Sequence, residues 1–227
     1  MAGVPYSFVV PTLNEAAGIA QLLEQLRIRF PNAELVVVDG GSSDNTCELA
    51  RPICDELIES APGRALQMNL GAQRATGQYL LFLHADSVPG LDESQLQSYF
   101  MANPAWGFCR VSLEGTERVF KIISGFINVR SRVTQVATGD QMLFIQREFL
   151  RRAGSFDQIP LMEDVAFSKR MRKLTPPLCI KEPVTTSSRR WREAGVLRTI
   201  LKMWALRFAY LIGVSPEHLW HFYYGDD

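Results

Sequence analysis

The sequence is poor in the residue types that usually build metal centres and disulfide frameworks. Its 227 residues include three histidines and four cysteines, and no two cysteines form a C-x-x-C pair. These counts disfavour a structural zinc site and a disulfide-stapled fold. They favour a reducing compartment, so we expect a cytoplasmic protein stabilised by its hydrophobic core.

An excess of one charge and long apolar runs are also missing. Lys and Arg total 24, and so do Asp and Glu, so the formal net charge is zero. Bulk nucleic acid is therefore not an expected partner. No uncharged run reaches the roughly 18 residues that a membrane-spanning helix needs. The first residues show no basic and apolar pattern of a signal peptide, so we expect none.

Three well-known site motifs are absent as well. The sequence contains no G-x-x-x-x-G-K-[ST], no G-x-G-x-x-G and no G-x-S-x-G. Their absence argues against a P-loop nucleotidase, a dinucleotide-binding domain and an α/β-hydrolase nucleophile elbow.

Short apolar runs alternate with helical patterns along the first half of the chain. The runs at 6–11, 35–38 and 79–83 are nearly continuous, and helical spacing of apolar residues fills the segments between them. This alternation predicts an α/β fold with a mainly parallel sheet that is buried on both faces. A boundary is expected near residue 185, with a main domain at 1–185 and a helical extension at 186–227.

Polar side chains follow each predicted strand at the point where the strand ends. Asn14 and Glu15 follow the first strand, Asp39 the second and Asp86 the third. Ligands of open α/β sheets bind outside the carboxyl ends of the strands, so these residues predict a ligand-binding crevice. For each acid the alternative is a structural role, in which it caps the following turn or helix.

Four segments, in order, carry a family resemblance. They read VVPTLNEAAGI, VVVDGGSSDNT, GRALQMNLGAQRATGQYLLFLHADS and LMEDVAFSKRMR. Together they resemble a family 2 glycosyltransferase with the GT-A fold over about residues 6–175. The HAD and SSRRW segments are most similar to a small bacterial subgroup of single-domain, family 2-like transferases. The resemblance implies a Rossmann-like, mainly parallel sheet flanked by helices, with a C-terminal helical tail.

The resemblance also implies a nucleotide-diphosphate sugar as donor, with UDP as the expected nucleotide. Asp39 would accept a hydrogen bond from the nucleobase, and Glu15 would lie near the ribose or the base. The residues that the resemblance places around the nucleotide are Pro11, Thr12, Glu15, Asp39, Arg64 and Asn69.

A divalent cation, Mn²⁺ or Mg²⁺, is the implied cofactor. Asp86 would ligate the metal on the diphosphate, as the last acid of the family's D-x-D-type motif. That motif usually begins with Asp, but here it reads His84-Ala85-Asp86. Imidazole suits Mn²⁺ better than Mg²⁺, so His84 is either a metal ligand or a partly buried residue at the strand end.

Catalysis is assigned by resemblance to the Glu163-Asp164 pair. Asp164 would be the general base that takes the proton of the acceptor hydroxyl, and one base with direct attack predicts inversion at the anomeric carbon. The alternative is a helix N-terminal acid stabilised by the helix dipole. The expected acceptor side is Gly139, Asp140 and Gln141.

Two basic segments near the C-terminus complete the candidate site. Arg189 and Arg190 would grip the diphosphate and Trp191 would stack on a sugar or base, unless this segment is a solvated loop. The segment 196–214 predicts a helix with an apolar stripe, and we expect it to dock on the protein or form a homodimer face. Peripheral contact with the inner membrane face is the alternative. The stripe comprises Leu197, Ile200, Leu201, Trp204, Phe208, Leu211 and Ile212.

Two other functions remain open from sequence alone. A nucleotidylyltransferase also places acids on a parallel sheet, but it usually has a Gly-rich basic loop after the first strand. Here that position reads Pro-Thr-Leu-Asn-Glu. A non-catalytic module that binds a sugar nucleotide is the other alternative. The sugar and the hydroxyl acceptor (glycan, lipid or small molecule) are not specified by any of these motifs.

Overall fold

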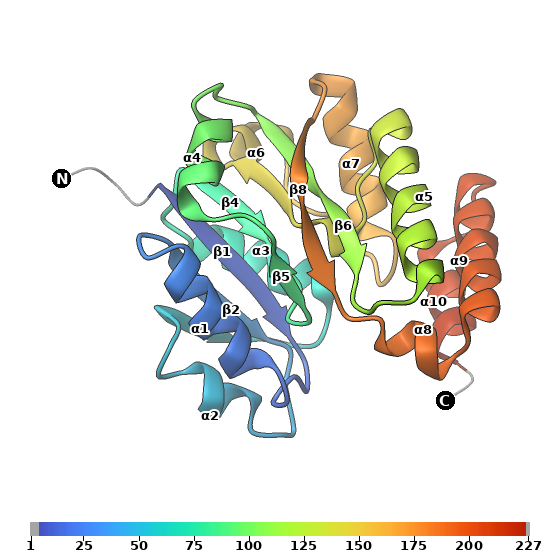
Figure 1. Ribbon diagram of the computed structural model, residues 1–227, viewed down its shortest axis with the longest axis horizontal. Helices are drawn as coiled ribbons and strands as arrows, with labels where there is room; N and C mark the ends of the chain where they lie inside the picture. Colours follow the sequence, from blue (N-terminus) through green and yellow to red (C-terminus); the bar gives the residue numbers. More distant parts are fainter. Residues whose placement is uncertain (1–4, 226–227) are drawn as a thin grey trace.

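The computed structural model describes residues 5–225 and contains one eight-stranded sheet with helices on both faces (Figure 1). The strand order is β3-β2-β1-β4-β7-β6-β8-β5. The first four positions are mutually parallel, which confirms the predicted parallel α/β sheet. Their strands are β1 (Tyr6–Thr12), β2 (Glu34–Asp39), β3 (Glu56–Glu59) and β4 (Tyr79–Phe82).

The second half of the sheet is mixed, and its order could not be read from apolar runs. The strand β7 is antiparallel to both of its neighbours, β4 and β6, and β8 is parallel to β6 and antiparallel to β5. The bounds are β5 (Ser87–Pro89), β6 (Trp106–Leu113), β7 (Leu143–Gln146) and β8 (Leu178–Thr186).

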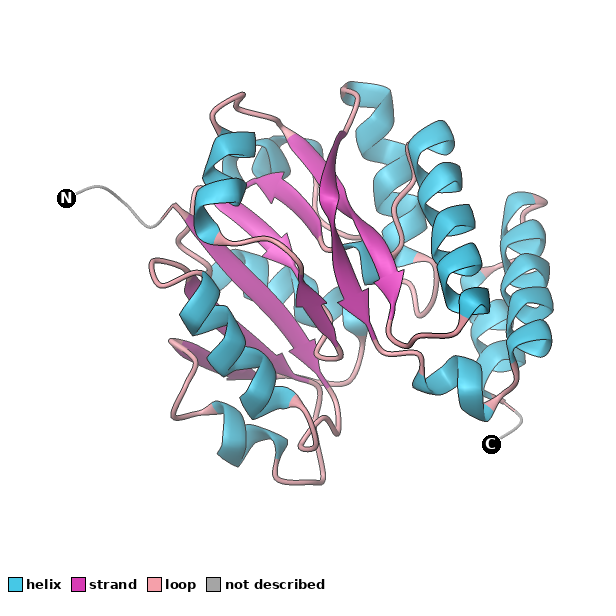
Figure 2. Cartoon of the chain, in the orientation of Figure 1, coloured by secondary structure: helices cyan, strands magenta, loops and turns pink. Residues whose placement is uncertain are grey.

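Helices cover both faces of the sheet (Figure 2). Phe8 and Val10 pack with α1 (Ile19–Arg29), α2 (Thr46–Ala50) and α4 (Glu93–Phe100) on one face. Val9 points the other way because side chains alternate along a strand. On that face the core includes α3 (Arg64–Arg74), α6 (Arg147–Ala153) and α7 (Glu163–Leu174). A Cβ on Gly71 of α3 would lie 2.3 Å from Val9 Cγ1, so glycine permits the close contact between α3 and β1.

The remaining helices lie beside the sheet's second half. They are α5 (Arg118–Thr134), α8 (Arg189–Glu193), α9 (Val196–Leu211) and α10 (Pro216–Tyr224). One small core joins α5 to Trp191, Val196 and Ile200, and a second joins α7 to Leu206 and Leu219. The described part of the C-terminal extension therefore packs on the main domain through two separate apolar cores.

The predicted apolar stripe of α9 is not the face that docks. Leu206 is buried and Ile200 is half-buried, whereas Leu197, Trp204 and Phe208 are exposed. The helix thus docks through Ile200 and Leu206, most of the stripe is left uncovered, and the homodimer face stays a prediction. Among residues 5–225, no helix is long and apolar enough to cross a bilayer.

Candidate active site

The carboxyl ends of β1 and β2 meet at Thr12 and Asp39. These two residues are register partners, and Thr12 Oγ1 donates a hydrogen bond to Asp39 Oδ1 at 3.1 Å. Asp39 is 1% exposed, and its Oδ2 accepts hydrogen bonds from the N–H groups of Gly41 (3.0 Å) and Ser42 (2.7 Å). Ser42 Oγ donates to the other oxygen.

These contacts determine the charge state of Asp39. Burial alone would raise the pKa of the carboxyl, but the hydrogen bonds from Ser42, Gly41 and Thr12 outweigh burial and hold the pKa below its ordinary value. Asp39 therefore organises the turn after β2, which is the structural alternative that the sequence left open. A bond to a nucleobase would add to this role.

The turn after β1 is tied to the turn after β2. Asn14 adopts a left-handed conformation (φ 56°), and its Oδ1 accepts from the N–H of Ser43 at 2.9 Å. The N–H groups of Asn14 and Glu15 donate to the hydroxyls of Ser42 and Thr46, both at 2.8 Å. The Pro-Thr-Leu-Asn-Glu segment is thus held in one shape at the rim where the sequence predicts a ligand.

Gln67 is a buried polar residue of this rim that sequence reasoning missed. Its Nε2 donates to the carbonyls of Thr12 and Val38, each at 2.8 Å. It therefore joins the ends of β1 and β2 to α3. A glutamine one turn into a helix carries no signal in a single sequence.

The predicted catalytic pair lies at the N-terminus of α7. The N–H groups of Gly139 and Val165 donate to the two oxygens of Asp164, both at 2.6 Å. Arg64 Nε lies 3.0 Å from Glu163 Oε1, and Arg64 Nη2 lies 3.9 Å from Asp164 Oδ2. One corner of the site therefore brings together four segments that are distant in the chain. They are the start of α3, the strand end at His84, the 139–141 turn and the start of α7.

Gly139 permits the closest approach in this corner. A Cβ on Gly139 would lie 1.7 Å from Arg64 Nη2 and 2.4 Å from His84 Nε2. A side chain at position 139 would therefore push the Arg64 guanidinium and the His84 ring away from their places beside the Asp164 carboxylate. This contact also places His84, the residue that replaces the usual first Asp of the metal motif, next to the candidate base Asp164.

Burial changes the ionisation of both acids that flank Asp164. It raises the pKa of Glu163, and the nearby Arg64 opposes that rise. Burial likewise raises the pKa of Asp140, opposed by a hydrogen bond from Thr138 and by the charge of Arg130. Arg130 Nε and Asp140 Oδ1 are buried and have no hydrogen-bond partner among the described residues. Arg130 was not predicted, because it lies mid-helix in α5 among other basic residues.

The backbone is strained at two residues near the corner formed by Arg64, His84, Gly139 and Asp164. Met142 follows the 139–141 turn with φ 41°, and Met162 precedes Glu163 with φ 70°. Left-handed conformations are unfavourable for such side chains, and they often accompany functional sites. The two residues flank the turn that carries Asp140 and the helix start that carries Asp164.

The candidate metal ligands do not form a closed site by themselves. Among residues 5–225, no group of three His, Cys, Asp or Glu side chains is arranged to hold a metal ion. Asp86 is exposed, and its carboxylate accepts a hydrogen bond from Ser87 Oγ at 3.1 Å. A carboxylate in this state fits a cation that takes most of its ligands from phosphate and water.

Other predicted residues have structural contacts in this structure. The amide of Asn69 both donates to and accepts from the backbone of Phe156 (2.8 and 2.9 Å), so it fastens the 154–156 loop. Gln141 is fully buried and bonds to Ser131 Oγ and the carbonyl of Cys109. These contacts give Asn69 and Gln141 structural roles, and their expected places beside the nucleotide and the acceptor stay predictions.

The SSRRW segment forms the loop before α8 and α8 itself. The Trp191 ring packs against the Phe120 and Ile123 core of α5, so stacking on a sugar would require α8 to move. Arg189 is exposed, and the side chain of Arg190 lies outside the part that the structure describes. The N–H of Ser187 donates to the carbonyl of Asp86 at 3.1 Å, which joins this segment to the candidate metal ligand.

A narrow pocket runs from Pro11 at the end of β1 to the corner around Asp164. Its apolar floor is closed by side chains of β4, β7 and the 154–156 loop. Its lining residues are Pro11, Arg64, Met68, Phe82, Leu83, His84, Gly139, Leu143, Phe156 and Asp164.

Comparison with known proteins shows which families and folds the chain resembles. Residues 7–115 match the family model described as Glycosyl transferase family 2. The chain is 39% identical over 94 residues to a PGL/p-HBAD biosynthesis glycosyltransferase of Mycobacterium bovis, which covers 38% of this chain and 37% of that protein. It is 29% identical over 103 residues to an uncharacterized glycosyltransferase of Haemophilus influenzae, which covers 42% and 41%. The matches thus span about two fifths of these relatives.

Solved structures show the same fold over more of the chain. TarS 1-349 of S. aureus superposes with a TM-score of 0.65 at 17% identity, over 81% of this chain and 60% of that one. The mannosyltransferase PcManGT of Pyrobaculum calidifontis gives a TM-score of 0.60 at 24% identity, over 82% and 57%. Residues 7–115 are thus similar to glycosyltransferase family 2, and the fold of the chain is GT-A.

Proposed function

We propose that this chain is an inverting glycosyltransferase that moves a sugar from a nucleotide-diphosphate donor, UDP-linked by expectation, to a hydroxyl acceptor. The observation that carries the proposal is the corner in which Gly139, Arg64 and His84 surround Asp164 beside the nucleotide rim. Known relatives support the donor class, since TarS 1-349 was solved with UDP and PcManGT with GDP-Man and Mn²⁺.

Asp164 is the proposed general base. Its carboxylate takes the proton of the acceptor hydroxyl while that oxygen bonds to the anomeric carbon of the donor sugar. The bond from that carbon to the diphosphate breaks at the same time, and the nucleoside diphosphate leaves with the electron pair. Attack from the face opposite the leaving group inverts the configuration. The backbone N–H groups of Gly139 and Val165 hold the carboxylate in place for this step.

The donor side is assigned to the strand ends. The nucleoside would lie on the rim formed by Pro11, Thr12, Glu15 and Asp39. Arg64 would lie between the nucleotide and the general base Asp164. Asp86 would hold a divalent cation, with His84 as a second candidate ligand. When bound, the cation would neutralise charge on the diphosphate. Arg189 is the exposed cation of the segment joined to Asp86, and we assign it to the same diphosphate.

Asp140 is assigned to the acceptor side, with Arg130 as its partner. Both have a buried polar atom that no described residue satisfies, and the charges of Asp140 and Asp164 act on Arg130. A polar group of the acceptor would satisfy them, so we expect these residues to select and orient it.

The test is a comparison of Asp164→Asn with Asp157→Asn. The control replaces an exposed acid that pairs with Arg170 on the surface. We expect Asp164→Asn to lower the release of nucleoside diphosphate from sugar nucleotides by about 10²–10⁴-fold, with nucleotide affinity unchanged. Equal rates for the two variants would show that Asp164 is not the base. Release of pyrophosphate from a nucleoside triphosphate and a sugar phosphate would instead support a nucleotidylyltransferase.

A further inference from the structure

Two helices carry more than half of the large apolar side chains that are exposed in the described part of the chain. On each helix the residues recur at three- or four-residue spacing, so they form one stripe. Each of these side chains is between 58% and 77% exposed. They are Ile122, Phe126, Val129 and Val133 of α5, and Leu197, Leu201, Trp204, Phe208, Leu211 and Ile212 of α9 and its C-cap.

The two stripes lie on neighbouring helices, and we call them together the α5–α9 face. Side chains of α5, including Ile123 and Ile127, pack with Val196 and Ile200 of α9, and the two helices run in the same direction (Figure 1). At about 100° per residue, each stripe lies next to the side by which its helix contacts the other.

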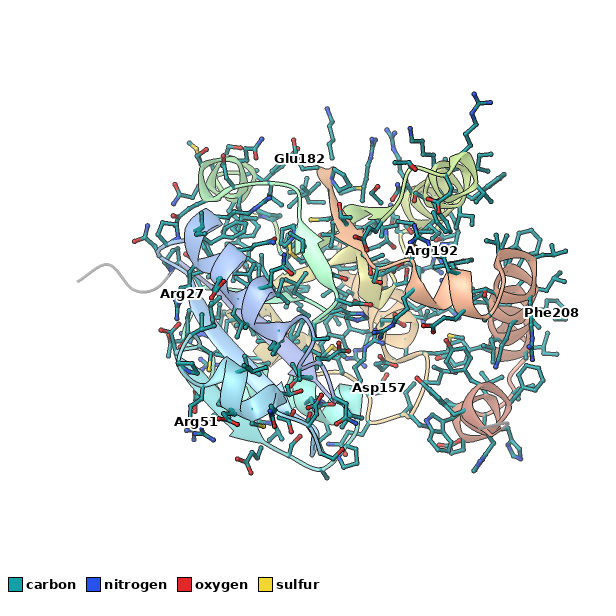
Figure 3. All side chains as sticks on the ribbon, turned by 60° about the horizontal axis from the view of Figure 1, so that its bottom comes forward. Arg27, Arg51, Asp157, Glu182, Arg192 and Phe208 are labelled. Carbon is teal, nitrogen blue, oxygen red and sulfur yellow. The ribbon has the colours of Figure 1, made fainter. Side chains whose placement is uncertain are left out.

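Both stripes also point away from the protein core. Ser124 and Asn128 bond α5 to β6 on the opposite side of that helix, and Leu206 is buried on the opposite side of α9. Phe208 lies at the outer edge of the molecule (Figure 3). The stripes therefore face the same way and are open to an external partner.

The charged residues of these two helices are all basic. The chain has equal numbers of basic and acidic residues, yet α5 and α9 contain seven Lys or Arg and no Asp or Glu. Arg118, Lys121 and Arg132 are exposed beside the α5 stripe, and Arg198 is exposed beside that of α9. The acid just before α5, Glu117, is paired with Arg192.

We infer that the α5–α9 face binds the surface of an anionic lipid bilayer. Apolar stripes with large aromatic residues, flanked by cations and free of acids, are what an interfacial helix needs to insert among anionic headgroups. A second copy of the chain fits less well. A two-fold dimer would bring this surface against itself, so its cations would face cations with no acid on either helix to pair them.

The inference does not depend on the proposed reaction, but it would position the site. The inner sides of the same helices contact the catalytic corner, through Arg130 of α5 and through the packing of Leu206 with Val165 of α7. Binding to a bilayer through the outer sides would therefore place Asp164 about one helix layer from the lipid surface.

Vesicle flotation with the whole chain tests the inference. Vesicles of phosphatidylcholine alone are compared with vesicles that contain about 30% phosphatidylglycerol. We expect binding to the anionic vesicles only, and weaker binding at 1 M salt because the Debye length falls to about 3 Å. The double variant Phe126→Ser/Trp204→Ser should bind at least about tenfold less.

The matched control is Ile28→Ser/Met101→Ser, which removes two apolar side chains of 80% and 87% exposure elsewhere on the surface. It should bind vesicles as the unmodified chain does. Three results would overturn the inference: no binding of the folded chain to anionic vesicles, equal binding by the Phe126/Trp204 variant, or equal binding to both lipids. A solution mass of two chains that falls to one in that variant would show that a second copy covers the face instead.

Discussion

The substitution Gly139→Ala should separate activity from stability in this protein. The added Cβ would lie 1.7 Å from Arg64 Nη2 and 2.4 Å from His84 Nε2. An ordinary contact needs about 3.5 Å, so the guanidinium would have to withdraw by about 2 Å. That movement breaks the 3.0 Å contact between Arg64 and Glu163 and changes the surroundings of Asp164.

The expected cost is large for catalysis and small for folding. Misplacement of catalytic groups by about 1 Å lowers rates on the order of 10²-fold. The colliding atoms are the ends of side chains, which can move, so the loss of stability should be at the low end of about 1–3 kcal/mol. The assay is the release of nucleoside diphosphate from sugar nucleotides, together with urea unfolding of the same sample.

Gly125→Ala is the matched control, because no atom lies within 4 Å of its added Cβ. It should leave activity unchanged and raise the free energy of unfolding by up to about 1 kcal/mol, because alanine is favoured over glycine inside a helix. If Gly139→Ala retained activity within threefold of Gly125→Ala, the contact among Gly139, Arg64 and His84 would not be part of the catalytic machinery.

Three further predictions follow from the rim and the core. The lowered pKa of Asp39 stabilises the fold above the ordinary carboxyl pKa, and this stabilisation is lost as the pH falls through the folded-state pKa. The stability gap between the unmodified chain and Asp39→Asn in urea should therefore shrink below about pH 4; a constant gap contradicts this. Asn69→Ala should lower the free energy of unfolding by about 1–3 kcal/mol without changing nucleotide affinity. Unchanged stability with weaker nucleotide binding would instead assign Asn69 to the nucleotide site. Gly71→Ala should lower the free energy of unfolding by about 1–3 kcal/mol, because the new Cβ collides with Val9. A urea midpoint equal to that of the unmodified chain would refute this prediction.

The sequence predicted the parallel half of the fold because each strand there is a separate apolar run that ends in a polar turn. Thr12 and Asp39 come together as expected, since parallel strands deliver their carboxyl ends to one edge. The second half was not predictable, because β6, β7 and β8 pair out of chain order. Strand pairing of that kind depends on long-range packing, which local periodicity does not report.

The candidate site was predictable where residues follow a strand or open a helix. Gln67 and Arg130 were missed because their roles depend on the carbonyls and charges that other segments bring to them. Trp191 was assigned to a ligand on the basis of residue type, but it packs on α5. The α9 stripe was expected to dock or to form a homodimer face, and periodicity alone does not show that most of it is left exposed by the rest of the chain.

Calorimetric titration of nucleotides tests the central claim most directly. UDP, GDP and their common sugar conjugates would each be titrated into the chain, with and without Mn²⁺. The account predicts metal-dependent binding of one of the two nucleotides, lost in Asp86→Ala and retained in Asp157→Asn. Absence of binding by any nucleotide, from folded protein, would contradict the account and show that this GT-A fold carries another function.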